Sequence, residues 1–189
     1  MTDGELVRLL RERAYLEGEF LLRSGRRSRY YLDKYRFETH PALLRELGER
    51  IAERALSLPG GSPDLLAGPE LGAVALAASA ALAGELPFLI VRKDAKAYGT
   101  ARRIEGVFEP GQRVCLVEDV VTTGGAAVAA VRALREAGLE CRSAVCVVDR
   151  DEGGADALAR HAVRLYPLFR AAEIVLPDAG NEPKNGSVA

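Results

Sequence analysis

The sequence lacks the residues that disulfide-bonded, zinc-binding and membrane-spanning proteins need. It has only three cysteines in 189 residues and no Cys-x-x-Cys pair, so we expect neither disulfides nor a zinc site. It has no run of 18 apolar residues and no apolar leader, so we expect neither a membrane span nor a signal peptide, and therefore a cytoplasmic protein. The formal net charge of −1 favours neither nucleic acid nor membrane as a partner.

What is present predicts one globular α/β domain. Hydrophobic residues make up 48% of the chain and charged residues 28%, and the length suits a single sizeable core. We expect this domain to span residues 1–176, with a basic hairpin segment in about 1–35 and a core in about 40–176. Residues 177–189 carry Pro, Gly, Asn and charge without core residues, which predicts a loose tail.

The periodicity of apolar residues predicts a mostly parallel sheet flanked by helices. The spacing of apolar residues and the positions of Gly and Pro predict the bounds of each helix and strand. Helices are expected at 3–16 (ended by Gly18), 41–56, 73–84, 126–137 and 155–162; hairpin strands at 19–23 and 28–33; buried strands at 64–67, 88–91, 114–117 and 143–148; and a further edge strand from 163–168 or 172–176.

The segment 114–125 combines a predicted strand, two carboxylates and a turn rich in Thr and Gly, which makes it the strongest candidate for a binding site. Four apolar residues are followed by Glu118 and Asp119, then by a turn, Thr122–Gly125, that opens the helix at 126–137. Free amides at a helix N-terminus favour a phosphate, and glycines let the backbone approach it closely. The two carboxylates repel phosphate but can accept hydrogen bonds from a ribose diol, with or without a nearby Mg²⁺. The segment therefore predicts a site for a ribose 5-phosphate.

An apolar strand that ends in Glu-Asp also occurs in P-loop nucleotide triphosphatases. That class requires Gly-x-x-x-x-Gly-Lys-[Ser/Thr], which is absent from this sequence, as is the dinucleotide-binding pattern Gly-x-Gly-x-x-Gly. A purely structural turn remains the other alternative. It would not need two carboxylates beside Thr-Thr-Gly-Gly at the carboxyl end of a parallel strand, where open α/β sheets bind ligands.

Glu-Asp-Val-Val-Thr-Thr-Gly-Gly resembles the phosphoribosyl diphosphate (PRPP) signature of the type I phosphoribosyltransferases. The resemblance implies a type I phosphoribosyltransferase-like fold and PRPP as donor substrate. Glu118 and Asp119 would also serve catalysis by holding the ribose ring. The residues that the resemblance assigns to PRPP in this segment are Glu118, Asp119, Val120, Val121, Thr122, Thr123, Gly124, Gly125 and Ala126.

The basic hairpin indicates the acceptor. Phe-x-Leu-Arg-Ser-Gly followed by Ser-x-Tyr-Tyr-x-Asp, within 20–33, resembles the N-terminal hood of orotate phosphoribosyltransferases. Arg23 stands where that family usually has a Lys that reaches diphosphate and orotate. For Arg26, Arg27 and Arg29 we favour the alternative of solvent-exposed charges on a hairpin.

Residues 92–103 carry five cations and one internal carboxylate without helical or strand periodicity, which predicts a loop that binds a polyanion. A charged surface loop is the alternative. The segment resembles the mobile catalytic loop of orotate phosphoribosyltransferases, which closes over the neighbouring subunit's active site. The resemblance gives Arg92, Lys93 and Lys96 to the diphosphate, makes Lys96 catalytic, and implies a homodimer with shared sites. Tyr98 stands where many relatives have His, so no general acid is assigned.

Two further segments complete the predicted site. The turn Gly68–Gly72 also precedes a helix and predicts a second anion site; in the family it receives the diphosphate, and some members carry a Lys where Glu70 and Leu71 stand here. Arg150 follows the strand at 143–148 and occupies the position that binds the orotate carboxylate, with Thr122 and Arg23 nearby. A surface ion pair of Arg150 with Asp149 or Asp151 is the alternative.

The resemblance implies transfer from PRPP to orotate, giving orotidine 5′-monophosphate and diphosphate in pyrimidine (UMP) synthesis. Mg²⁺ is the expected cofactor, carried mainly by PRPP, and no metal ligands are assigned to the protein. Two rivals remain. A purine phosphoribosyltransferase is opposed by the hairpin and Arg150, and a non-catalytic PRPP-sensing regulator is opposed by the Lys96 loop and by the absence of a recognisable helix-turn-helix segment.

Overall fold

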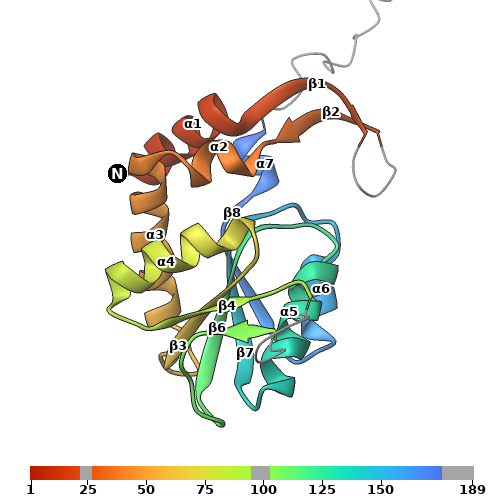
Figure 1. Ribbon diagram of the computed structural model, residues 1–189. Coiled ribbons are helices and arrows are strands. Elements are labelled where there is room, and N and C mark those ends of the chain that lie inside the picture. The colour runs from red at the N-terminus through yellow and green to blue at the C-terminus, as the bar shows by residue number, and fades with distance from the viewer. Residues whose placement is uncertain (22–26, 95–102, 176–189) are drawn as a thin grey trace, which may run out of the picture.

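Strands β3 to β8 form one six-stranded sheet between two layers of helices (Figure 1). The computed structural model describes residues 1–21, 27–94 and 103–175. The strand order is β5-β4-β3-β6-β7-β8, and every neighbouring pair is parallel except β4 and β5. This confirms the predicted mostly parallel sheet. The strands of this sheet are β3 (Leu65–Pro69), β4 (Phe88–Val91), β5 (Ile104–Glu105), β6 (Arg113–Val121), β7 (Glu140–Asp149) and β8 (Arg164–Arg170).

Helices cover both faces of the sheet because its central strands are apolar on both sides. α3 and α4 lie on one side, with α1, α2 and α7 near one end, and α5 and α6 lie on the other (Figure 1). In β6, Cys115 and Val117 join the core on the first side, whereas Val114 and Leu116 join the core on the second. The helices are α1 (Asp3–Ala14), α2 (Lys34–Glu38), α3 (Pro41–Leu56), α4 (Gly72–Gly84), α5 (Gly125–Glu136), α6 (Gly154–Ala159) and α7 (Ala171–Ile174).

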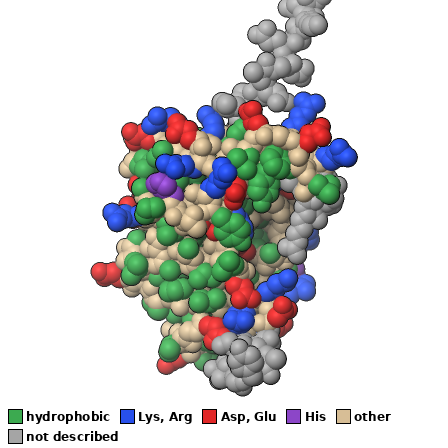
Figure 2. Space-filling model, turned by 45° about the horizontal axis from the view of Figure 1, so that its top comes forward, with side chains coloured by type: hydrophobic (Ala, Val, Ile, Leu, Met, Phe, Trp, Pro, Cys, Tyr) green, Lys and Arg blue, Asp and Glu red, His purple; other side chains and the backbone are tan. Residues whose placement is uncertain are grey.

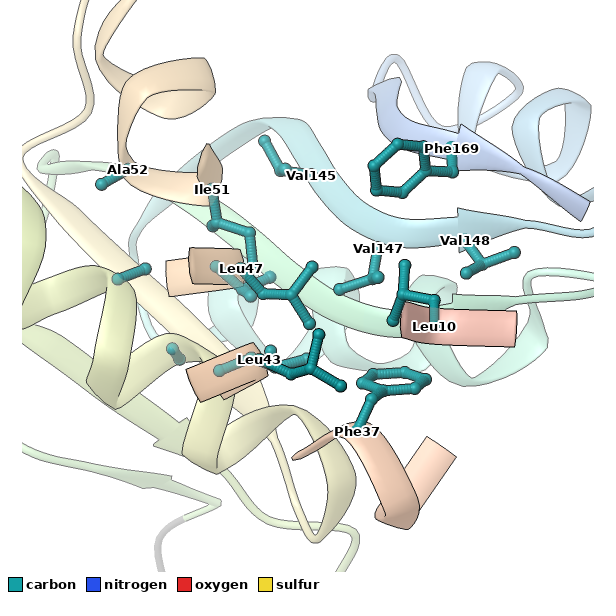
Figure 3. Close-up of a cluster of buried hydrophobic side chains, with 14 of the residues drawn as sticks. Leu10, Phe37, Leu43, Leu47, Ile51, Ala52, Val145, Val147, Val148 and Phe169 are labelled. Atoms are coloured by element: carbon teal, nitrogen blue, oxygen red, sulfur yellow. The ribbon is translucent and has the colours of Figure 1, made fainter. Parts of the chain in front are cut away.

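The larger core ties the N-terminal segment to the sheet. Leu10 of α1 and Phe37 of α2 are buried and point toward Val147 and Val148 of β7 (Figure 3). α2 was not predicted, because its five residues are too few to display helical periodicity. Its burial fixes the end of the hairpin against the sheet.

The hairpin consists of β1 (Tyr15–Leu21) and β2 (Arg27–Leu32), paired antiparallel as predicted. The expectation that Gly18 ends the first helix is wrong. α1 ends at Ala14, and Gly18 lies within β1, where the strand register shifts between Glu17 and Phe20. The strand starts early because Tyr15 pairs with Leu32 and stacks on the ring of Tyr30, 5.8 Å away between centroids.

The C-terminal part corrects a second expectation. β8 is the predicted edge strand, but the strand considered for 172–176 is wrong, because residues 171–174 form α7. The Glu173 carboxylate accepts the Arg170 backbone N–H at 2.6 Å, and Arg11 of α1 donates to the Ile174 carbonyl oxygen at 2.6 Å. The capping carboxylate of Glu173 and the hydrogen bond from Arg11 thus stabilise a short helix that the sequence pattern does not predict. The tail predicted at 177–189 lies outside the described residues.

The three cysteines are free and buried in β6 and β7. Burial raises the pKa of Cys115 to about 12 and of Cys141 to about 11, so both stay protonated thiols near neutral pH. Within the described residues, no helix combines the length and the apolar character needed to cross a membrane.

The α3–α4 contact tests how tightly this core is packed. Gly48 of α3 lies against Ser79 of α4, where a Cβ atom would approach the Ser79 Cβ to 2.7 Å. We expect Gly48→Ala to lower the free energy of unfolding by about 1–3 kcal/mol, because overpacking forces the two helices apart. Gly4→Ala in α1, where nothing lies within 4 Å, serves as the control and should change stability little. Equal urea midpoints for the two variants, read by circular dichroism, would contradict the packing.

Candidate functional site

The predicted phosphate turn lies at the carboxyl end of the central strand β6. α5 begins at Gly125, one residue before the predicted start, and Gly124 adopts φ 80°, a conformation that side chains with a Cβ rarely take. A Cβ on Gly124 would also lie 3.0 Å from the Gly154 Cα. Gly125 and Ala126 are exposed, so the free amides of the first helical turn can reach a ligand.

Both carboxylates of the signature are buried in the last part of β6. Glu118 is 7% exposed and Asp119 is 4% exposed. Asp119 Oδ1 accepts the Val120 backbone N–H at 2.5 Å, whereas Glu118 Oε1 has no hydrogen-bond partner in the structure. Burial, reinforced by the charge of Asp119, raises the pKa of Glu118 to about 8. A carboxyl group with an unused buried oxygen suits a hydroxyl-bearing ligand such as ribose.

Two side chains of α2 that the sequence analysis did not single out contact Asp119. Lys34 Nζ donates to Asp119 Oδ2 at 2.5 Å. Burial lowers the pKa of Lys34, but the charge and hydrogen bond of Asp119 outweigh it, so the net pKa is raised. Glu38 is 3% exposed; burial, followed by the charge and hydrogen bond of Asp119, raises its pKa to about 8. One sequence signal was available, since only four of the 26 basic residues are lysines and Lys34 is one of them.

The second turn, 68–72, lies against Asp119, near the end of the strand that leads into the first turn. Gly72 begins α4, and a Cβ there would collide with Asp119 Oδ2 and lie 2.6 Å from Lys34 Nζ. Because Gly72 has no Cβ, the Asp119 carboxylate and the Lys34 ammonium can both pack against the N-terminus of α4. The turn at 68–72 therefore lies beside the carboxylate that precedes the turn at 122–125.

The cationic segment after β4 begins beside this second turn. The Lys93 backbone N–H donates to Glu70 Oε1 at 2.7 Å, and Arg92 Nη1 lies 3.8 Å from Glu70 Oε2. The Arg92 backbone N–H also donates to the Arg103 carbonyl oxygen at 2.7 Å, which holds both ends of the segment together. Arg92 and Lys93 thus start beside the turn at 68–72. The predicted site residues Arg23, Lys96 and Tyr98 lie outside the described residues.

Arg150 lies at the carboxyl end of β7, next to the signature strand. Its backbone N–H donates to the Val121 carbonyl oxygen at 2.9 Å, and its side chain is 9% exposed. The guanidinium lies 5.3 Å from the Tyr30 ring centroid, donates to Tyr30 Oη at 3.4 Å and pairs with Glu152 at 3.1 Å, while Nε has no partner.

The alternative ion pair of Arg150 with Asp149 or Asp151 does not form. Asp149 instead accepts the Asp151 backbone N–H at 3.0 Å, and Asp151 pairs with Arg170. Arg27 and Arg29 of the hairpin are exposed, as favoured from the sequence.

The described residues contain no group of three or more His, Cys, Asp or Glu side chains placed to hold a metal ion. Both Asp119 oxygens already accept hydrogen bonds, from Val120 and Lys34. Glu118 and Asp119 alone do not form a complete cage of oxygen ligands for Mg²⁺. A magnesium ion that keeps water and ligand phosphate oxygens as its main ligands would fit this site.

The raised pKa values of Glu38 and Glu118 predict a pH-dependent stability. Between the ordinary value of 4.5 and about 8, the folded protein holds protons that the unfolded chain has released. This stabilisation is fully present below the unfolded pKa and is lost as the pH rises toward the folded pKa. We expect Glu38→Gln to flatten the fall in unfolding free energy measured in urea between about pH 5 and about pH 8. Glu53→Gln, at an exposed position of α3, is the control; an unchanged slope in Glu38→Gln would contradict the assignment.

Comparison with known proteins places this geometry in a family. The model of the phosphoribosyl transferase domain matches residues 35–163. The orotate phosphoribosyltransferase of Methanocella arvoryzae is 46% identical over 174 residues, which cover 92% of this chain and 97% of that protein.

Two solved structures of the orotate phosphoribosyltransferase of Mycobacterium tuberculosis are also similar. The complex with Fe(III) dicitrate has a TM-score of 0.80 and 34% identity, covering 92% of this chain and 98% of that one. The complex with PRPP has a TM-score of 0.76 and 31% identity, covering 90% and 97%. The chain described here therefore belongs to the phosphoribosyl transferase domain family and, within it, to the orotate phosphoribosyltransferases.

Proposed function

We propose that this protein transfers the phosphoribosyl group of PRPP to orotate, giving orotidine 5′-monophosphate and diphosphate in pyrimidine biosynthesis. The observation that carries the proposal is the meeting of three groups at one sheet edge: the buried carboxyls of β6, the phosphate turn before α5, and Arg150 under Tyr30 of the hairpin. The names and coverage of the relatives support the same reaction.

In the proposed donor site, the amides and hydroxyls of residues 122–126 bind the 5-phosphate. Glu118 and Asp119 accept hydrogen bonds from the ribose hydroxyls, and Val120 and Val121 set the end of the strand from which the turn departs. The amides of the turn at 68–72 receive the diphosphate, together with Arg92 and Lys93. The proposal assigns Arg23, Lys96 and Tyr98 to PRPP as well.

In the proposed acceptor site, the Arg150 guanidinium forms charge-assisted hydrogen bonds with the orotate carboxylate. The unpartnered Nε and the largely buried position support this role, because a desolvated guanidinium gains more from a carboxylate than an exposed one. Thr122 and Arg23 complete the proposed orotate contacts. A purine lacks this carboxylate, so the same site disfavours a purine acceptor.

The proposed chemistry depends on positioning and electrostatics. Orotate N1 forms a bond to ribose C1 while the bond from C1 to the diphosphate oxygen breaks, and the electron pair leaves with the diphosphate. Glu118 and Asp119 hold the ring on which positive charge develops, and Lys96, Lys93 and Arg92 stabilise the negative charge of the leaving group. Enzymes of this family generally depend on Mg²⁺, which when bound would neutralise part of the diphosphate charge; we propose that it arrives mainly on PRPP.

The reaction is tested by following the ultraviolet absorbance of orotate with PRPP and Mg²⁺, with adenine, hypoxanthine and uracil in parallel. We expect loss of orotate alone. Arg150→Gln should raise the KM for orotate about 10–100-fold and leave the KM for PRPP nearly unchanged, because only the carboxylate contact is lost. Arg142→Gln, at an exposed position of β7, is the control. Consumption of a purine, or PRPP binding without reaction of any base, would contradict the proposal.

We further propose a homodimer with shared active sites. Among the described residues, two large apolar side chains are almost fully exposed: Leu82 of α4 is 84% exposed and Val107, just after β5, is 90% exposed. Hydrophobic side chains also gather across the middle of one face of the molecule (Figure 2). Exposed apolar patches of this kind are typical of surfaces that another chain covers.

Shared sites predict complementation between two impaired variants, assayed at an orotate concentration far below the raised KM of Arg150→Gln. Lys96→Ala removes the proposed catalytic cation of the loop, and Arg150→Gln weakens the acceptor site. If the loop acts on the neighbouring subunit, mixed dimers contain one intact site, and re-equilibrated equimolar mixtures should regain about a quarter of the wild-type activity. Each variant alone is the control. No gain on mixing, with dimers verified by analytical ultracentrifugation, would show that the loop acts within its own subunit.

A further inference from the structure

The turn at 68–72 has no cation of its own for a diphosphate. Its side chains are those of Pro69, Glu70 and Leu71, and the one charged group is negative. Glu70 is partly neutralised by Arg92, 3.8 Å away, and by the Lys93 backbone N–H. Neither contact leaves a surplus positive charge at the turn itself, whereas a diphosphate brings several negative charges.

Lys34 supplies a cation at this turn from a distant part of the sequence. Its Nζ would lie 2.6 Å from a Cβ on Gly72, so the ammonium stands against the first residue of α4. Phe37, which is fully buried, anchors α2 and thereby the base of the Lys34 side chain. The Lys34 side chain is still 32% exposed, so the ammonium can contact a ligand without entering the core.

The partner of Lys34 is itself a proposed ligand group. Asp119 Oδ2 accepts from Lys34, and the same carboxylate is assigned to the ribose hydroxyls of PRPP. A ribose bound there would compete with Lys34 for the carboxylate oxygens. The ammonium would then stand between the sugar and the turn that receives the diphosphate, beside the bond that breaks.

Pairing with Asp119 relieves a buried unpaired charge, but that role alone does not require the ammonium to stand at the start of α4. Buried ion pairs contribute little net stability because the cost of desolvation offsets the attraction. Glu38, which also contacts Asp119, has an oxygen without a hydrogen-bond partner, so Lys34 does not complete a saturated network. The Lys34 ammonium lies 5.4 Å from the centroid of the Tyr35 ring, and its other neighbours are Asp119 and the first residue of α4, both in the proposed donor site.

We propose that Lys34 is a PRPP-binding residue that provides the positive charge missing from the turn at 68–72. The inference rests on the proposed function. Without PRPP the ammonium pairs with Asp119. With PRPP bound it contacts the diphosphate side of the ribose. Its role in binding the donor differs from that of Arg150, which is assigned to the acceptor.

The test compares Lys34→Met with Arg36→Met, which removes an exposed charge from the same short helix. We expect Lys34→Met to weaken the binding of PRPP and of inorganic diphosphate about 10–100-fold, as read by ligand-induced shifts in melting temperature without orotate. In turnover, the KM for PRPP should rise while the KM for orotate stays nearly constant. Arg36→Met should leave both unchanged. Equal losses in the two variants, or none in Lys34→Met, would overturn the inference.

A second variant separates charge from folding. Leu71→Lys, introduced into Lys34→Met, returns an ammonium to the turn at a 73% exposed position without rebuilding the pair with Asp119. Recovery of diphosphate binding would support a role of charge at the turn; no recovery, with the double variant folded and its melting temperature equal to that of Lys34→Met, would overturn it. Wild-type protein that fails to consume orotate would refute the proposed function, whereas active wild type with undiminished Lys34→Met would refute only the inference.

Discussion

The burial of Asp119 constrains much of this site. Its carboxylate lies at the end of the central strand, held by the Val120 amide on one oxygen and by Lys34 on the other. A buried carboxylate without such partners would be costly, so the strand end, the short helix α2 and the glycine at the start of α4 must meet in one geometry. The hairpin is fixed over the sheet because α2, which follows it directly, carries this cation.

Much of the fold could be predicted because its signals are local. Strands such as Phe88–Val91 are apolar runs between turn residues, and α5 follows a glycine turn with regular spacing of Val128, Val131 and Leu134. The errors fall where local pattern and tertiary contact disagree. Glycine often ends a helix, but Gly18 lies within a strand whose register shifts at that point. The segment that forms α7 is apolar, and its helical state depends on contacts with Arg11.

The site divides in the same way. Glu118, Asp119 and the turn after them are contiguous, so their chemistry can be read from neighbouring residues. Lys34 and Glu38 join the site only through tertiary structure, 85 residues from Asp119 in the case of Lys34. No periodicity or motif connects them to the strand. The one sequence feature that set Lys34 apart is that few of the basic residues are lysines. The contact of Arg150 with Tyr30 could not be predicted from the sequence either, although each residue belongs to a segment that the sequence analysis singled out.

The contact between Arg150 and the hairpin divides the enzyme into an inherited part and an exchangeable part. The family model begins at residue 35, directly after the hairpin, and contains the signature strand and both turns. Tyr30, which supports the guanidinium of Arg150, lies in the preceding segment. The parts shared across the family therefore suit the common donor, and one contiguous N-terminal stretch closes over the place of the variable acceptor. Exchange of that stretch could alter which base is accepted, provided that cations at the positions of Arg23 and Lys34, which are proposed to bind PRPP, are kept.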